Sequence, residues 1–525
     1  MRTNRSASLY ALWTVCILVL VGLHFVHPLA DFPNNSPWMD YSKYTDEGWY
    51  GSAAARFFLS GHWFWRGDFN AAVALPVWPL LLAGVFRFTG VSMTAARVFI
   101  VTIFAGNLLL SYAVLQTQAA RWVALAAVTL LATSPFLYSF SRLAILEPLL
   151  VCFMLASWLL ALRLSQASPG SRTAMLLLIG VLSCLLVLSK TTGLFLIPST
   201  LFLVAHAYGF RASLRALATV AVAALVPWCA WYVLLVRPHY RVDYQYLFEA
   251  NHWPQPVGLR DHIAAYGWAL HGMLWISPTL CIAAIVLLAL ALALVPPSRE
   301  AASARPAKNA FLRNPLIGAS LLASSGYIFL IGAQNHPQPR YYETVIYPLT
   351  FLLALASADL ANRTRATTLR LAGAAALAVL LVVSVMGTLS IASYTRHPEY
   401  TWLNAANGVA RYINQHPAPN HMLLSISGDD LTLMTHLPSI CDDFGTYDLP
   451  YRIHVYQPSW YATWNELDPG TLVDLKTQYS LEQVASFTAF DDPDRDVFIL
   501  YRMHPLPPAQ QNYVATEEAK ANADK

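Results

Sequence analysis

Residues 71–86 read AAVALPVWPLLLAGVF, and the topology of the whole chain depends on whether this apolar stretch crosses a membrane. A bilayer span needs about 20 apolar residues. This stretch is shorter, is interrupted by Pro76 and Pro79, and is followed at once by Arg87. If it crossed a bilayer, every later loop would change sides. The charges of those loops can therefore decide between the two topologies.

The sequence on either side of this stretch has the composition of a membrane protein. Of the 525 residues, 56% are hydrophobic and 12% are charged, whereas soluble proteins carry about 25% charged residues. Uncharged apolar runs near the length of a span recur over roughly the first 395 residues. We therefore predict a polytopic α-helical membrane protein with about eleven transmembrane helices. These occupy residues 9–26, 98–117, 122–141, 148–162, 173–189, 191–210, 216–236, 273–295, 315–333, 341–358 and 371–394.

The basic residues favour an interfacial position for residues 71–86. With that stretch outside the bilayer, 14 Lys and Arg residues fall in six short segments on one face of the membrane. The short loops on the other face hold only Arg142, Lys190 and Arg340. Because short cytoplasmic loops collect Lys and Arg, we expect a multi-pass inner-membrane protein with a cytoplasmic N-terminus. The segments predicted to face the periplasm are 27–97, 237–272, 334–340 and the region from about 395.

The chain divides into three predicted parts. Residues 1–394 form a transmembrane domain, and its first periplasmic loop, 27–97, carries two amphipathic segments suited to the headgroup layer. Residues 395–510 alternate helix and strand patterns, which predicts a small periplasmic α/β domain. Residues 511–525 are polar and are expected to be disordered. Within the α/β domain we expect helices at 400–415 and 472–487 and strands at 421–426 and 497–501.

Two adjacent acids, Asp46 and Glu47, stand at the start of the first amphipathic segment. Neighbouring like charge and burial raise the pKa of a carboxylate toward the operating pH, which suits a general base. The same pair also suits the first turn of a helix, where acidic side chains stabilise the helix dipole. Both interpretations remain open at this point.

Further charges lie at the outer ends of predicted spans. Glu147 opens a run that is otherwise uncharged, and Lys190 joins two helices with almost no loop. Charged residues at membrane depth are costly and usually functional. The ammonium of Lys190 and the planar guanidinium of Arg340 both suit a phosphate at that depth. The structural alternatives are an ion pair between Arg142 and Glu147, and a lysine that snorkels to the interface.

The sequence names no cofactor. The six cysteines lack the spacing of a metal site or a redox pair, and no glycine-rich phosphate loop is present. A divalent metal is left open. The composition predicts membrane lipid as a partner and no nucleic acid.

Taken in order, these motifs resemble the C-type glycosyltransferase superfamily. Asp-Glu-x-x-Tyr ends at Tyr50 in the first outer loop, Ser-Arg-x-x-x-x-Glu occupies residues 141–147, and Arg340-Tyr341 precedes a Tyr-Pro pair at 347–348. The pattern is most similar to the branch that includes bacterial protein O-mannosyltransferases and the lipid A aminoarabinose transferase. The resemblance covers roughly residues 8–394. It rests on the order, spacing and common outer face of the motifs.

This resemblance implies an inverting transfer of a sugar from a polyprenyl-phosphate donor to a lipid, glycan or protein acceptor in the periplasm. It implies that Asp46 acts as the base or orients the acceptor, and that Glu47 and Glu147 are the other catalytic acids. Lys190 and Arg340 would hold the donor phosphate and stabilise its charge as it leaves. The remaining motif residues, implied to bind substrate, are Tyr50, Arg142 and Tyr341.

The chain departs from the aminoarabinose branch at residues 70–79. That branch has a His-Tyr-x-x-Lys-Pro-Pro run, and this chain has NAAVALPVWP, without the histidine or lysine. The departure weakens the case for a lipid A acceptor and for a metal held there. In the predicted α/β domain, the aromatic segment 460–464 suits either sugar stacking or a packed lid, and aromatic clusters usually fill cores.

Two other functional classes were weighed against the enzyme. A transporter or flippase of lipid-linked sugar typically has internal repeats and broken helices near the midplane, and this sequence has neither feature. A non-catalytic membrane scaffold would explain the fold. It would not explain why Asp46, Glu147, Lys190 and Arg340 all fall on one face.

Overall fold

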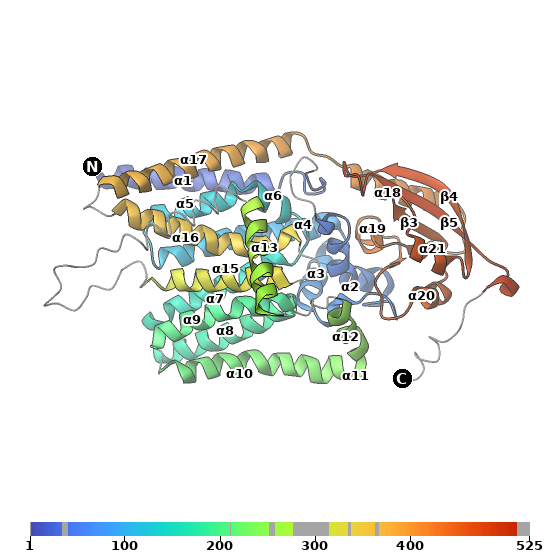
Figure 1. The fold of residues 1–525 in the computed structure, drawn as a ribbon, viewed down its shortest axis with the longest axis horizontal. Helices are drawn as coiled ribbons and strands as arrows, with labels where there is room; N and C mark the ends of the chain where they lie inside the picture. Colours follow the sequence, from blue (N-terminus) through green and yellow to red (C-terminus); the bar gives the residue numbers. More distant parts are fainter. Residues whose placement is uncertain are drawn as a thin grey trace.

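The computed structural model consists of a helical bundle with a smaller α/β unit at one end (Figure 1). The N-terminus lies at the opposite end of the bundle from the α/β unit. The described residues are 2–33, 40–209, 212–250, 258–276, 314–333, 338–362 and 367–511. The predicted tail 511–525 therefore lies almost wholly outside the description.

Among the described residues, seven helical segments are long and apolar enough to cross a membrane, and each coincides with one of the predicted runs. Six are Met93–Gln116 (α4), Glu147–Gln166 (α7 and η3), Pro169–Ser189 (α8), Thr191–Tyr208 (η4 and α9), Ser213–His239 (α10, η5 and α11) and Pro315–Ala333 (α15). The seventh, Ala374–Gln415, runs from α17 (Thr367–Arg396) into α18 (Thr401–Gln415).

The other four predicted runs have different outcomes. The run 9–26 lies mostly in α1 (Arg2–His24), and 341–358 lies mostly in α16 (Glu343–Asn362). The run 273–295 falls almost entirely outside the described residues. Only seven described segments meet the length and composition of a span, so the count of eleven stays a prediction.

The prediction of one continuous helix over 122–141 is wrong. The structure has α5 (Arg121–Ala132) and a separate short helix, α6 (Pro135–Phe140). Ser134 accepts a hydrogen bond from the backbone N–H of Leu137, and Pro135 occupies the first position of the new helix. A serine cap followed by proline starts a helix, because proline has no N–H to donate to the preceding turn.

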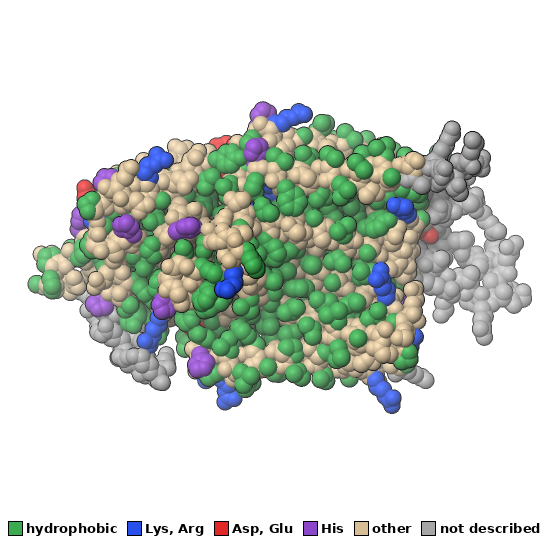
Figure 2. All heavy atoms as spheres, turned by 180° about the vertical axis from the view of Figure 1, so that it is seen from behind, with side chains coloured by type: hydrophobic (Ala, Val, Ile, Leu, Met, Phe, Trp, Pro, Cys, Tyr) green, Lys and Arg blue, Asp and Glu red, His purple; other side chains and the backbone are tan. Residues whose placement is uncertain are grey.

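The outer surface of the bundle is apolar, as contact with lipid requires (Figure 2). On α10 (Ser213–Trp231), for example, Leu214, Leu225 and Val226 are all exposed. Exposed aliphatic side chains of this number would be a liability in water. They are the expected surface of a helix that faces a bilayer.

Two helices of the first loop lie between the bundle and the α/β unit (Figure 1). They are α2 (Asp46–Ser60) and α3 (Val77–Thr89), the second of which covers most of the decisive stretch 71–86. Helix α3 buries Trp78, Leu82 and Phe86, one per turn, and exposes Leu80 and Phe88. One face of the helix therefore packs against the protein, and the other face also carries apolar side chains, so its amphipathic character stays a prediction. Its depth in a bilayer stays a prediction.

The α/β unit contains a five-stranded sheet in the order β2-β1-β3-β5-β4. Strand β1 pairs in parallel with β2 and β3, whereas β5 pairs antiparallel with β3 and β4. The strands are Leu423–Leu424 (β1), Ser439–Ile440 (β2), Trp460–Trp464 (β3), Tyr479–Thr488 (β4) and Val497–Pro505 (β5). The helices besides α18 are Gly428–Thr435 (α19), Leu449–Tyr456 (α20) and Pro469–Leu475 (α21).

The predicted helix over 472–487 is wrong in its larger part. Helix α21 ends at Leu475, and β4 begins at Tyr479. A β-bulge shifts the register between Gln483 and Ala485. An extra residue at a bulge interrupts the two-residue alternation of a strand. The apolar side chains around it then fall at irregular spacings, which imitated the period of a helix.

The aromatic segment 460–464 is part of the core. Trp460, Tyr461 and Trp464 are at most 5% exposed, and the Trp464 ring packs against Trp402 and Phe498. The packing interpretation is therefore confirmed over sugar stacking on these rings.

A buried ion cluster joins the α/β unit to the first loop. The Arg56 guanidinium on α2 donates to Asp68 at 2.8 Å and to Asp429 at 2.7 Å, and all three side chains are buried. Asp68 also accepts from the backbone N–H of Cys441 at 2.9 Å and lies 3.3 Å from Arg452. Breaking such a pair leaves an uncompensated buried charge at a cost of about 3–5 kcal/mol. The α/β unit is therefore fixed against the loop.

Candidate functional site

Arg340 lies at the centre of a buried cluster of acids at the end of the bundle that faces the α/β unit. It belongs to η6 (Pro339–Tyr342) and is 5% exposed. Its guanidinium pairs with Asp40, and its backbone N–H donates to the second Asp40 oxygen at 3.1 Å. Nη2 lies 2.7 Å from Asp46 Oδ2, and Nε lies 3.9 Å from Glu147 Oε1. Three separate segments, the first loop, α7 and η6, thus meet at one side chain.

Lys190 brings a second cation into the cluster. It lies between α8 and η4, and its Nζ donates to Glu147 Oε1 at 2.5 Å. The same Nζ lies 4.4 Å from the centre of the Tyr341 ring, and the Arg340 guanidinium lies 5.1 Å from that ring. Cations at these distances are attracted to the ring face. Tyr341 therefore contacts both cations, and its role in binding substrate stays a prediction.

The cluster has one more negative than positive charge when all groups are ionised, since three carboxylates surround two cations. Burial raises the pKa of Asp46 above its ordinary value, while the charge of Arg340 acts in the opposite direction. A buried carboxylate with a raised pKa in a cluster of charges is typical of a general base. Tyr50, one helical turn after Asp46 on α2, lies close enough to feel the charges of Asp46 and Lys190, and burial raises the pKa of its hydroxyl.

The cluster retains unused hydrogen-bonding capacity. Among the described residues, Arg340 Nε and Glu147 Oε2 are buried and have no hydrogen-bond partner, and Asp46 Oδ2 has only its ion-pair contact. Buried polar atoms are normally paired, and unpaired ones call for an explanation. A polar ligand at this position would supply the missing partners.

Glu47 points away from this cluster. Its carboxylate receives two hydrogen bonds from Arg97 on α4, at 2.8 and 2.5 Å, and a third from the backbone N–H of Ala144 at 2.7 Å. Arg97 also donates to the carbonyl oxygens of Pro28 and Ala30. Glu47 thus ties together three segments around the site. The structure separates the two adjacent acids that the sequence grouped.

Arg142 also lies outside the cluster. It donates to the Tyr138 hydroxyl at 2.7 Å and to the carbonyl oxygens of Val26 and His27 at the end of α1. Among the described residues, no ion pair joins Arg142 to Glu147, which pairs with Lys190 instead. The alternative pairing considered for these two residues is therefore wrong.

Two participants were missed from the sequence, Asp40 and Arg97. Asp40 comes six residues before Asp46, and no periodic pattern marks it. Arg97 could have been identified, because it is a charged residue directly before the long apolar run at 98–117. The same signal identified Glu147. Glu343, three residues after Arg340, is also buried, with neither carboxyl oxygen bonded.

No metal centre is apparent in the part of the chain that the structure describes. There, no group of three or more His, Cys, Asp or Glu side chains is arranged to hold an ion. His336, four residues before Arg340 in the sequence, lies outside the described residues.

Comparisons with known proteins agree with this architecture. Residues 71–241 match the family model described as dolichyl-phosphate-mannose-protein mannosyltransferase, which is about a third of the chain. A search of curated protein sequences gives no match.

Among solved structures, the chain is similar to ArnT from Cupriavidus metallidurans bound to undecaprenyl phosphate. The TM-score is 0.57 at 15% identity, over 97% of this chain and 99% of that one. It is also similar to the oligosaccharyltransferase of Archaeoglobus fulgidus in complex with zinc and sulfate, with a TM-score of 0.54 at 13% identity over 89% and 72%. For the same archaeon's AglB with an inhibitory peptide and a dolichol-phosphate, the values are 0.51, 10%, 93% and 74%. The resemblance to the C-type glycosyltransferase superfamily is confirmed at the level of the fold.

The placement of Glu47 generates a prediction about stability. Glu47→Gln should lower the thermal unfolding midpoint in detergent, because it leaves the Arg97 guanidinium buried without its negative partner. Removing one member of a buried pair costs about 3–5 kcal/mol of unfolding free energy. The matched control is Glu482→Gln, whose partner His504 and own side chain are both exposed, and it should leave the midpoint unchanged. An unchanged midpoint for Glu47→Gln together with lost sugar transfer would instead favour the catalytic role.

Proposed function

We propose that this protein transfers a sugar from a polyprenyl-phosphate donor to an acceptor at the outer face of the inner membrane. The observation that carries the proposal is the meeting of Asp46, Glu147, Lys190 and Arg340 in one buried cluster. The fold adds support, because the similar ArnT structure holds undecaprenyl phosphate and the similar AglB structure holds a dolichol-phosphate. The family match over residues 71–241 points to the same chemistry.

In this proposal Lys190 and Arg340 bind the donor phosphate. The unpartnered Arg340 Nε and the Lys190 ammonium supply N–H donors in a buried setting. Hydrogen bonds between ionised groups are short and strong, and a guanidinium matches the oxygens of a phosphate. Both cations would also stabilise the negative charge that develops on the phosphate as it leaves.

Asp46 is proposed to accept the proton of the acceptor hydroxyl. As the proton moves, the acceptor oxygen bonds to the anomeric carbon and the bond from that carbon to the phosphate oxygen breaks, with its electron pair left on the phosphate. Attack opposite the leaving phosphate inverts the sugar. Protonation cancels the charge of Asp46, which lies 2.7 Å from Arg340. The Arg340 cation then has one competitor fewer for the phosphate that is gaining charge.

Glu147 and Tyr341 are proposed to position the two cations, and Tyr50 to line the site beside Asp46. Glu147 accepts from Lys190 and lies beside Arg340, so it fixes the spacing between them.

The first test concerns orientation. Helix α2, which carries Asp46, and the α/β unit lie at the end of the bundle opposite the N-terminus (Figure 1), and the distribution of basic residues among the loops favours a cytoplasmic N-terminus. A reporter that is active only in the periplasm should therefore be active when fused after residue 400 and inactive after residue 305. Activity confined to the cytoplasm at residue 400 would refute the proposed orientation.

The second test is Asp46→Asn, which keeps the size and shape of the side chain but cannot take a proton. Loss of a general base typically lowers the rate by about 10²–10⁴, while donor affinity should change little because both cations remain. Transfer is measured with radiolabelled polyprenyl-phosphate hexoses and a membrane extract. If Asp46 serves only the first turn of α2, asparagine should preserve activity. A transfer rate within about threefold of that of the unsubstituted protein is a loss well below that range. It would show that Asp46 is not the general base.

The third test is Lys190→Gln, which removes one of the two proposed phosphate ligands. A hydrogen bond to a charged group is worth about 1.5–3 kcal/mol, so donor affinity should fall about tenfold to a hundredfold. The matched control is Lys43→Gln. Lys43 is as deeply buried as Lys190 and is likewise paired with an acid, Asp492 at 3.0 Å, but it lies outside the cluster. Equal donor affinities in the two folded variants would exclude Lys190 from the donor site.

A further inference from the structure

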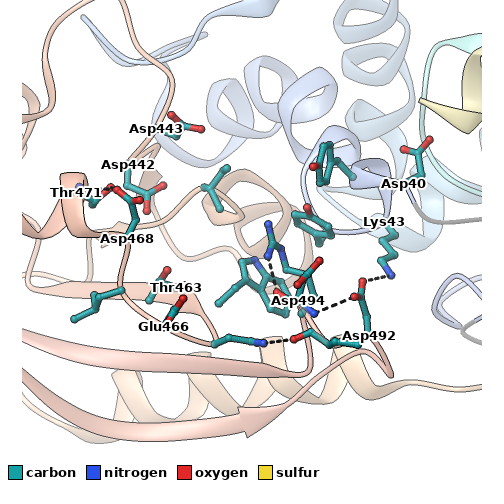
Figure 3. A pocket seen from close by; sticks show the side chains of 18 of the residues that line it. Asp40, Lys43, Asp442, Asp443, Thr463, Glu466, Asp468, Thr471, Asp492 and Asp494 are labelled. Carbon is teal, nitrogen blue, oxygen red and sulfur yellow. Dashed lines mark hydrogen bonds and ion pairs between the residues drawn. The ribbon is translucent and has the colours of Figure 1, made fainter. Parts of the chain in front are cut away.

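A cavity of about 1050 Å³ lies between the first loop and the α/β unit. Asp40, which pairs with Arg340, forms part of one wall of the cavity. The cavity therefore adjoins the buried cluster around Arg340. Figure 3 shows Asp40 and Lys43 on one side and Asp442, Asp443 and Asp468 on the other. We call this space the acidic cleft. Its volume is at the upper end of the range for small-molecule sites, about 300–1,000 Å³.

The acidic cleft lies at the carboxyl ends of the three parallel strands. Ile426 follows β1, Asp442 follows β2 and Asn465 follows β3, and all three residues line the cleft. The strand order places β1 between β2 and β3, so the chain leaves β1 toward one side and returns to its other side. Ligands of open α/β sheets bind in the crevice outside the carboxyl ends of the strands, where the strand order reverses. The topology therefore marks this cleft as a binding site.

The lining is strongly negative. It contains two cations, Lys43 and Arg495, and Lys43 is already paired with Asp492. The lining acids are Asp40, Asp442, Asp443, Glu466, Asp468, Asp492 and Asp494. A cleft lined by one sign of charge concentrates ligands of the opposite sign and repels those of the same sign. The cleft thus favours a cationic ligand and opposes one that carries phosphates.

Asp442 supplies a separate indication that something binds here. It is 8% exposed and its carboxyl group interacts with the Tyr461 hydroxyl, but its Oδ1 is buried and has no hydrogen-bond partner among the described residues. Burial and the neighbouring charge of Asp443 raise the pKa of Asp442 to about 7. An unpaired buried acceptor costs free energy unless a donor reaches it. A positively charged donor that enters the cleft would meet this requirement.

A neutral sugar fits the wall less well than a basic peptide does. Tyr461 and Trp464 line the cleft, but they are 1% and 5% exposed, and their rings are packed into the core. They therefore offer no free face on which a sugar ring could stack. Tyr41, which also lines the cleft, is 54% exposed, but it is a single ring whose face suits a cationic side chain as well as a sugar. The available groups are carboxylates on three successive loops, which suit the ammonium and guanidinium groups of separate side chains.

We propose that the acidic cleft binds a Lys- or Arg-containing polypeptide segment and leads the acceptor toward Asp46. The proposal rests on the proposed function only in treating this segment as part of the acceptor. Binding in the cleft itself requires no sugar transfer, so the two ideas can fail separately.

The experiment measures binding of a fluorescein-labelled nonapeptide of Lys, Gly and Ser to the full chain in detergent, by fluorescence anisotropy. A peptide with Glu in place of Lys is the control probe. The Lys peptide should bind and the Glu peptide should not. Asp442→Asn and Asp443→Asn should each weaken binding about tenfold, the value of one hydrogen bond to a charged group. Glu482→Gln, an exposed acid on β4 outside the cleft, should leave binding unchanged.

Several results would overturn the proposal. These are no binding of the Lys peptide, equal binding of both peptides, or binding that neither aspartate variant weakens. Displacement of the Lys peptide by a neutral or glucosamine oligosaccharide at equal concentration would reassign the cleft to a glycan. Asp443 is exposed, so its variant tests the proposal even where Asp442→Asn fails to fold. Peptide binding without sugar transfer would support this inference and contradict the proposed function. Sugar transfer without peptide binding would support the proposed function and contradict this inference.

Discussion

The first turn of α2 is the point on which the rest of the structure depends, because three consecutive residues there bind three different parts of the chain. Asp46 pairs with Arg340, Glu47 pairs with Arg97, and the backbone N–H of Gly48 donates to Asp430 of the α/β unit. A side chain at Gly48 would collide with the backbone of Asp430, so glycine is required for this approach. Each contact is buried, and a buried charge without its partner is costly. One helical turn thereby fixes the bundle, the outer loops and the α/β unit relative to one another.

The buried arginines repeat one structural solution. Arg340, Arg97 and Arg56 each bind carboxylates, and in every case the guanidinium connects segments that are distant in the sequence. The planar fork of arginine stays charged and can serve several oxygens at once. Among the described residues, unpaired buried atoms occur both around Arg340 and around Arg56, where Arg56 Nε and Asp429 Oδ2 have no hydrogen-bond partner. Glu47, by contrast, has partners for both carboxylate oxygens.

Much of the fold was predictable because its signals are local. An uncharged run of about span length predicts a membrane helix without knowledge of its neighbours, and Glu147, Lys190 and Arg340 were identifiable as charges at the ends of such runs. The pairing of these charges was not predictable. Asp46 and Glu47 are adjacent in sequence but point apart, since successive helical residues project about 100° from each other. Asp40 sits in a segment with no periodic pattern, and the bulge in β4 disguised a strand as a helix.

The contacts of α2 also bear on how the protein is made. The first loop is synthesised early, but the partners of its residues come later in the chain. Asp46 pairs with Arg340, Arg56 pairs with Asp429, and the Gly48 N–H donates to Asp430. The chain is synthesised from the N-terminus at about 5–20 residues per second. Because nearly 300 residues separate Asp46 from Arg340, the arginine is added well after the aspartate. The cluster around Arg340 is complete once residue 341 has been added, but until the last fifth of the chain has been made, Arg56 and Gly48 lack their partners Asp429 and Asp430. A chain that ends before Asp429 would therefore keep the bundle contacts of α2 but lose the contacts that fix the α/β unit against it.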